Sequence, residues 1–145
     1  MQIMKKGLML IEVLVTLSII LSILMISSFA NKSFKKYEEK IAIEYSANDI
    51  VNFINYGKSY SRRFRSSSYI LLQGKNVLVL GNKSKIIDTL KLPEDISITQ
   101  FNNNVLNIKN GGYVSDACTI RLKSKTGLKK EISIMVGTNY VHIKK

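Results

Sequence analysis

The hydrophobic pattern divides the chain into a first part typical of one long helix and a second part typical of strands. The run Leu8 to Ala30 is predominantly apolar and is long enough to cross a bilayer, which takes about 20 residues. Polar residues begin at Asn31, and an apolar stripe then follows at spacings of four, three and four: Ile43, Ala47, Ile50 and Ile54. Neither proline nor glycine interrupts this part before Gly57. The pattern predicts a helix from Leu8 to about 58 whose second half packs on a sheet.

Beyond Tyr69 the apolar period falls to two, which is typical of strands. The expected strands are Tyr69–Gln73, Asn76–Leu80, Lys85–Leu92, Ile96–Phe101 and Val105–Lys109, with turns at Gly74-Lys75 and Asn102 to Asn104. The last third alternates most regularly, with Cys118, Ile120, Leu122, Ile132, Ile134, Val136, Val141 and Ile143 on the apolar face and Thr119, Arg121 and Lys123 among the residues opposite. We expect a three-strand antiparallel meander with turns at Gly127 and at 137–139. The fold class is therefore α+β, a long N-terminal helix packed on a C-terminal antiparallel β-sheet.

Composition adds a strongly basic balance to this picture. The 145 residues carry a formal net charge of +12, which favours contact with anionic lipid, cell-wall polymer or nucleic acid. In the stretch from Lys58 to Tyr69, arginines interleave with aromatic residues and serines. Arg62, Arg63 and Arg65 are therefore candidate contacts to DNA or another polyanion. The alternative is an ordinary solvated polar loop, which is the commoner outcome in a basic protein.

The residues needed for catalysis or for metal binding are scarce. The single histidine, His142, falls on the solvent side of the last expected strand, and the single cysteine, Cys118, falls on an apolar face. The pattern therefore predicts a surface histidine and a buried free thiol. The four aspartates lack EF-hand spacing, and no phosphate-binding glycine loop occurs. We expect no enzyme activity, no metal site and no cofactor.

One carboxylate stands inside the apolar run. Glu12 is its only ionisable residue, and the run is preceded by Lys5, Lys6 and Gly7. A secretory signal places its small-residue cleavage site after the apolar stretch, whereas here the small residue comes before it. A cut after Gly7 would leave the membrane segment on the mature protein. A carboxylate in lipid is costly and usually functional; the alternative is a single-pass anchor with an accidental acid.

The stretch from Lys5 to Glu12 resembles the processing motif of type IV prepilins and pseudopilins. The resemblance implies that a membrane prepilin peptidase removes residues 1–7 by cutting between Gly7 and Leu8, and that Leu8 is then N-methylated. It implies that Glu12 pairs with the terminal amine of a neighbouring subunit and so sets axial register during assembly. It also implies the type IV pilin fold, with residues 8–30 in the membrane and 31–145 as an extracytoplasmic pilin domain.

The C-terminal half carries a second resemblance. Gly111-Gly112, Thr119-Ile120 with Leu122, the segment Ile132 to Gly137, and Val141 with Ile143 resemble the C-terminal meander of the H-type and competence minor pseudopilins. This implies a single-pass cell-membrane protein that enters a cell-surface filament in DNA uptake, type II-like secretion or pilus assembly. The implied partners are other pilins, an assembly platform protein and its ATPase. The alternatives are a major pilin, a membrane-anchored receptor for DNA or another polyanion, and an anchor for an enzyme domain.

Overall fold

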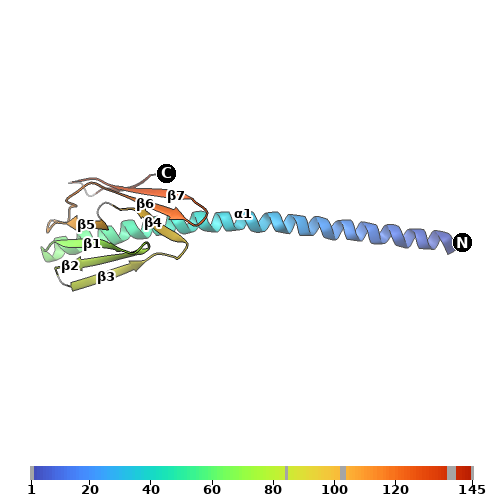
Figure 1. Ribbon diagram of the computed structural model, residues 1–145, viewed down its shortest axis with the longest axis horizontal. Coiled ribbons are helices and arrows are strands. Elements are labelled where there is room, and N and C mark those ends of the chain that lie inside the picture. Colours follow the sequence, from blue (N-terminus) through green and yellow to red (C-terminus); the bar gives the residue numbers. More distant parts are fainter. Residues whose placement is uncertain (1, 84, 102–103, 137–139, 145) are drawn as a thin grey trace. The chain divides into compact units, whose positions relative to one another are not determined.

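The computed structural model describes residues 2–83, 85–101, 104–136 and 140–144, with side chains from residue 10 onward except at 30, 32 and 144. The chain forms two compact units, Met1–Glu38 and Glu39–Lys145. Helix α1 (Gln2–Phe64) begins in the first unit and ends in the second, and all eight described strands belong to the second unit (Figure 1).

The first unit contains the apolar part of α1 and the charged residues that follow it as far as Glu38. Its large apolar side chains from Leu10 to Phe29 are all at least 52% exposed, over a helical stretch rich in apolar residues. Three hydroxyl groups within this part are satisfied by the helix itself, since Thr16, Ser18 and Ser22 donate to backbone carbonyls three or four residues earlier. The segment therefore has the length and the apolar surface that crossing a membrane requires.

The second half of α1 supplies one side of the core of the second unit. The predicted stripe is confirmed: Ile43, Ala47, Ile50 and Ile54 are each no more than 3% exposed. Figure 1 shows the strands lying alongside this part of the helix. Partly buried Ala42 and Val51 flank the stripe, so a wide apolar face is covered.

The helix ends later than the sequence predicted, at Phe64 instead of about 58. Gly57 does not stop it, because this glycine allows close packing against the sheet: an added β-carbon would lie 3.0 Å from the Cδ1 atoms of both Leu80 and Ile108. The actual end is a left-handed residue, Arg65 (φ 46°), followed by Ser66, whose N–H donates to the carbonyl of Ser61 at 3.2 Å. This is the Schellman arrangement that satisfies the last carbonyls of a helix.

The strands form two antiparallel four-stranded sheets instead of one. The first has the order β3-β2-β1-β5, with bounds β1 (Ser68–Gln73), β2 (Val77–Asn82), β3 (Lys85–Lys91) and β5 (Val105–Ile108). The second has the order β4-β6-β7-β8, with bounds β4 (Ile96–Gln100), β6 (Cys118–Ser124), β7 (Lys129–Ile134) and β8 (Val141–Lys144). The successive strands β4 and β5 therefore belong to different sheets. Between them Asn104 has φ 56°, the positive value expected of a turn asparagine, whereas Asn102 and Asn103 lie outside the described residues.

The predicted meander is confirmed as β6-β7-β8, and its apolar face joins the core. Cys118, Ile120, Leu122, Ile132 and Ile134 are buried, together with Ile70, Leu78, Leu80, Leu106 and Ile108 from the first sheet. The Cys118 thiol is buried and is not part of a disulfide within the chain, and His142 is exposed, both as expected. Val136 was expected on the apolar face but is 51% exposed, because β7 ends at Ile134 and the alternation stops there. The expected turn at 137–139 lies outside the described residues.

Candidate functional site

The predicted processing and assembly residues lie near the beginning of α1. Gly7 and Leu8 have helical backbone, and the described side chains begin after them. Glu12 is exposed and lies four residues after Leu8, one helical turn further along. Within the described part of the chain Glu12 has no hydrogen bond or ion pair.

The surface around Glu12 is apolar. Its neighbours Leu10, Ile11, Val13 and Leu14 are between 59% and 68% exposed. In lipid such a carboxylate is costly, by about 2.5–3.5 kcal/mol for a charge at the bilayer centre on insertion scales. No described residue of this chain offsets that cost, and the side chains of Lys5 and Lys6 lie outside the described ones.

The candidate polyanion contacts lie at the other end of α1. Arg62 and Arg63 are in its last turn, Arg65 follows directly, and all three are exposed. This corrects the expectation of a polar loop, since the segment is helical as far as Phe64. The guanidinium of Arg63 lies 5.7 Å from the ring centroid of Phe64, within cation–π distance. Cations in the last turn also interact favourably with the helix dipole, which gives Arg62 and Arg63 a structural role of their own.

Lys58 belongs to the same stretch but is buried, with 4% of its surface exposed. Its Nζ has no hydrogen-bond partner among the described residues, and burial lowers its pKa from the ordinary value of 10.5. The sequence analysis placed Lys58 in a surface patch. The signal that it missed was spacing, because Lys58 follows Ile54 by four residues and so continues the buried stripe.

A cationic face on the second sheet was also missed as a site. Arg121 and Lys123 of β6 lie beside Lys129 and Glu131 of β7, and with Thr99 and Gln100 of β4 they line a hollow of about 570 Å³. We call these six residues the cationic face. The alternation along β6 placed Arg121 and Lys123 opposite the core, but it did not show which residues of β7 and β4 would stand beside them.

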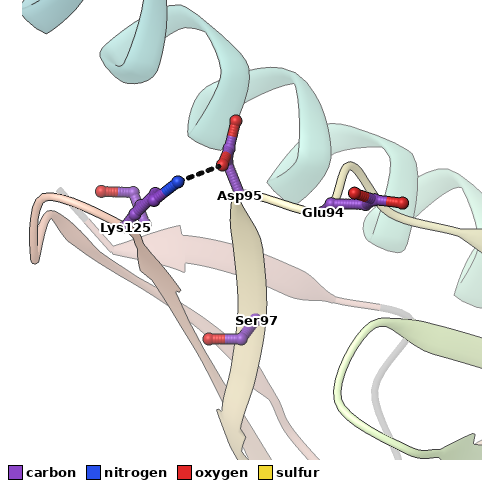
Figure 2. Close-up of a pocket in the computed structure, with 5 residues that line it drawn as sticks. Glu94, Asp95, Ser97 and Lys125 are labelled. Carbon is purple, nitrogen blue, oxygen red and sulfur yellow. Dashed lines mark ion pairs between the residues drawn. The ribbon is translucent and has the colours of Figure 1, made fainter.

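A smaller hollow of about 350 Å³ lies near the start of β4, lined by Glu94, Asp95, Ser97, Ser124 and Lys125. Figure 2 shows Lys125 directed at Asp95, 3.7 Å away, while Glu94 points away from this pair. Both paired side chains are at least 70% exposed, so the ion pair is an ordinary surface contact. Among the described residues, no group of three or more His, Cys, Asp or Glu side chains could hold a metal ion.

The fold is similar to that of a structurally known pilin. A crystal structure of the type IV minor pilin FimU of Pseudomonas aeruginosa matches with a TM-score of 0.62 over 75% of this chain and 92% of that chain, at 12% sequence identity. A second crystal form of FimU gives 0.58 over 70% and 92%, at 11% identity. No protein-family model and no curated protein sequence matches the chain. The helix and the antiparallel sheets of this chain therefore have the type IV pilin fold, as the sequence predicted.

Proposed function

We propose that this chain is a subunit of a type IV pilus-like filament. The observation that carries the proposal is one helix, α1, that joins an exposed apolar stretch fit for a bilayer to a domain with the type IV pilin fold. In a membrane-held subunit the stretch is first anchored in lipid. It then packs against equivalent helices once the subunit enters the filament.

Processing follows from the motif around Gly7. We infer that a prepilin peptidase cuts between Gly7 and Leu8, that Leu8 becomes the N-methylated first residue, and that residues 8–30 span the cell membrane while 31–145 lie outside the cytoplasm. Glu12 then pairs with the α-amine of a neighbouring subunit. In apolar surroundings, leaving one member of such a pair unmatched costs roughly 3–5 kcal/mol, which is enough to fix one axial register.

We further propose that the subunit is a minor pseudopilin. The resemblance of its C-terminal meander to minor pseudopilins and the minor-pilin identity of the structural neighbour both support this role over that of a major pilin. The machine is a competence, type II-like secretion or pilus system, with a platform protein and an ATPase as assembly partners.

Mass spectrometry of the protein from its native membrane tests the processing step. The mature chain should begin at Leu8 and carry one methyl group. Gly7→Ala should slow the cut, because a side chain larger than hydrogen then stands before the scissile bond, whereas Thr16→Ala in the same helix should be cut normally. An intact Met1 start in cells with an active prepilin peptidase contradicts the proposal.

Filament entry is tested separately with Glu12→Val. This variant should be processed like the wild type but should be strongly reduced in sheared filaments, since the amine of its neighbour loses its partner. Thr16→Val is the matched control, because it makes a polar-to-apolar change one turn further along at a hydroxyl that only serves its own helix. Normal assembly of Glu12→Val subunits would show that the register role is wrong.

A further inference from the structure

Two lysines face each other across neighbouring strands of the cationic face. Lys123 of β6 is the register partner of Lys129 of β7, so the two side chains leave the same side of the sheet. Like charges directly opposite each other destabilise a sheet. Neither lysine has an ion pair among the described residues, although the next pair on the same face of the sheet, Arg121 and Glu131, is joined at 2.5 Å between Nε and Oε1. An anion bound between the two lysines would relieve this repulsion.

A bulge in the adjoining strand adds polar groups to the same hollow. The register of β4 on β6 shifts between Ile98, opposite Leu122, and Gln100, opposite Arg121. Successive side chains of a regular strand point to opposite faces, but because of this bulge Thr99 and Gln100 both line the hollow. The hydroxyl of Thr99 donates to the carbonyl oxygen of Arg121 at 3.2 Å, so it cannot also donate to an anion. The side-chain amide of Gln100 is the donor that this strand offers to the hollow.

We propose that the cationic face binds the phosphate groups of a phosphodiester polymer. Its charged residues are three cations and one carboxylate, so the hollow carries an excess of positive charge. The Arg121–Glu131 pair uses Nε of the guanidinium and leaves its two terminal amino groups for a phosphate oxygen. None of the six residues is aromatic, so the face can hold a polymer backbone but offers no ring on which a base could stack.

A polymer fits this face better than a free phosphate ion. The lysines and the arginine are exposed, and an exposed site holds one small anion weakly. A polymer places several phosphates over the sheet at once and gains from the counterions that it releases. The site is separate from Arg62, Arg63 and Arg65 at the end of α1. It needs no filament, so its failure would leave the proposed function standing.

Binding is measured by fluorescence anisotropy with the full chain in uncharged detergent micelles and short labelled DNA duplexes of two unrelated sequences. Both duplexes should bind equally, and log K should fall linearly with log salt. The double variant Lys123→Gln/Lys129→Gln should bind roughly tenfold more weakly and should lower the salt slope by about 2, one for each phosphate contact. The matched control Lys85→Gln/Lys91→Gln removes the same charge from exposed positions of β3 in the other sheet and should leave binding within about twofold.

Three results would overturn the proposal. Equal weakening by the two double variants would show that net charge alone attracts DNA. Weakening confined to Arg62→Gln/Arg63→Gln would place the contact at the end of α1, and no binding at low salt would exclude any contact.

Competition then identifies the polymer. Displacement of DNA by poly(glycerol phosphate), but not by polyglutamate of matched charge, supports recognition of phosphodiesters in general, and displacement by unlabelled duplex alone supports DNA as the source. Displacement by polyglutamate as effectively as by phosphodiester polymers would overturn the preference for phosphate.

Discussion

A β-carbon added to Gly57 would lie 3.0 Å from Cδ1 of Ile108, so this glycine lets the last part of α1 pack closely against β5. Cδ1 of Leu80 lies at the same distance. Glycine in a helix costs roughly 0.5–1 kcal/mol relative to alanine, and close packing on the sheet offsets that cost here.

Gly57→Val should therefore lower the free energy of unfolding by about 1–3 kcal/mol, because the branched side chain overpacks the contact with Ile108 and Leu80. Urea denaturation followed by circular dichroism measures the change. Asn52→Val is the matched control, since it introduces the same side chain at an exposed position of the same helix and should change stability by less than about 0.5 kcal/mol. Equal effects at the two positions would mean that the close approach is not rigid.

Alanine substitutions at Gly74 and Gly112 distinguish the effect of backbone strain from that of a steric clash. Their φ angles are +73° and +78°, so alanine at either position is strained by about 1–2 kcal/mol. Only at Gly112 would the new β-carbon also meet backbone, at 2.6 Å from the carbonyl oxygen of Lys58. Gly112→Ala should therefore lower the free energy of unfolding by about 1–3 kcal/mol more than Gly74→Ala does. Equal unfolding free energies for both variants would show that the loop before β6 moves away from α1 without cost.

Lys58→Met should raise the melting temperature at pH 7, because it keeps the length of the side chain and removes an ammonium that has no described acceptor. Burial lowers the pKa of Lys58 in the folded state below 10.5, so between that lowered value and 10.5 the unfolded chain binds more protons. Stability linked to Lys58 therefore rises with pH across this window. Thermal unfolding from pH 7 to 10.5 should show a smaller rise for Lys58→Met than for the wild type.

The control for this experiment is Lys91→Met, which removes a charge from an exposed position of β3. Its melting temperature should follow that of the wild type at each pH. A lower melting temperature for Lys58→Met at pH 7, or an unchanged pH profile, would mean that the ammonium of Lys58 finds an acceptor in solution.

A chain beginning at Asn31 should be folded and monomeric, since it lacks the apolar run but keeps the buried stripe Ile43, Ala47, Ile50 and Ile54. A chain beginning at Asn55 should aggregate, because the apolar faces of both sheets are then uncovered. Circular dichroism and size-exclusion chromatography of the two fragments distinguish these outcomes. If the shorter fragment folds as well as the longer one, α1 is not part of the core.

The parts of the fold that could be predicted from sequence are those with a local period. The stripe from Ile43 to Ile54 and the meander around Ile120 and Ile132 follow directly from spacings of three or four and of two. The division into two sheets could not be predicted, because it depends on pairing between strands distant in sequence, β1 with β5 and β4 with β6. The true end of α1 was missed because Gly57 suggests a stop unless its packing partners are known.

The candidate sites divide in the same way. Gly7, Leu8 and Glu12 form a short motif that can be recognised from the sequence alone. Their roles stay predictions until processing and assembly are measured. The cationic face needs the register of Lys123 on Lys129 and the bulge at Thr99, neither of which the alternation of β6 contains. Lys58 was misplaced because its charge suggested the surface, although its spacing from Ile54 indicated the core.

One edge strand of the first sheet, β3, carries its charged residues in an order that opposes self-association. Its edge position and the 64% exposed side chain of Ile86 would otherwise favour pairing with another chain. Antiparallel pairing of two copies centred on Asp88 would set Lys85 of each against Lys91 of the other and the two Asp88 carboxylates against each other. Every charged contact in that arrangement is repulsive. Copies of this chain at high local concentration are therefore discouraged from joining their sheets along this edge.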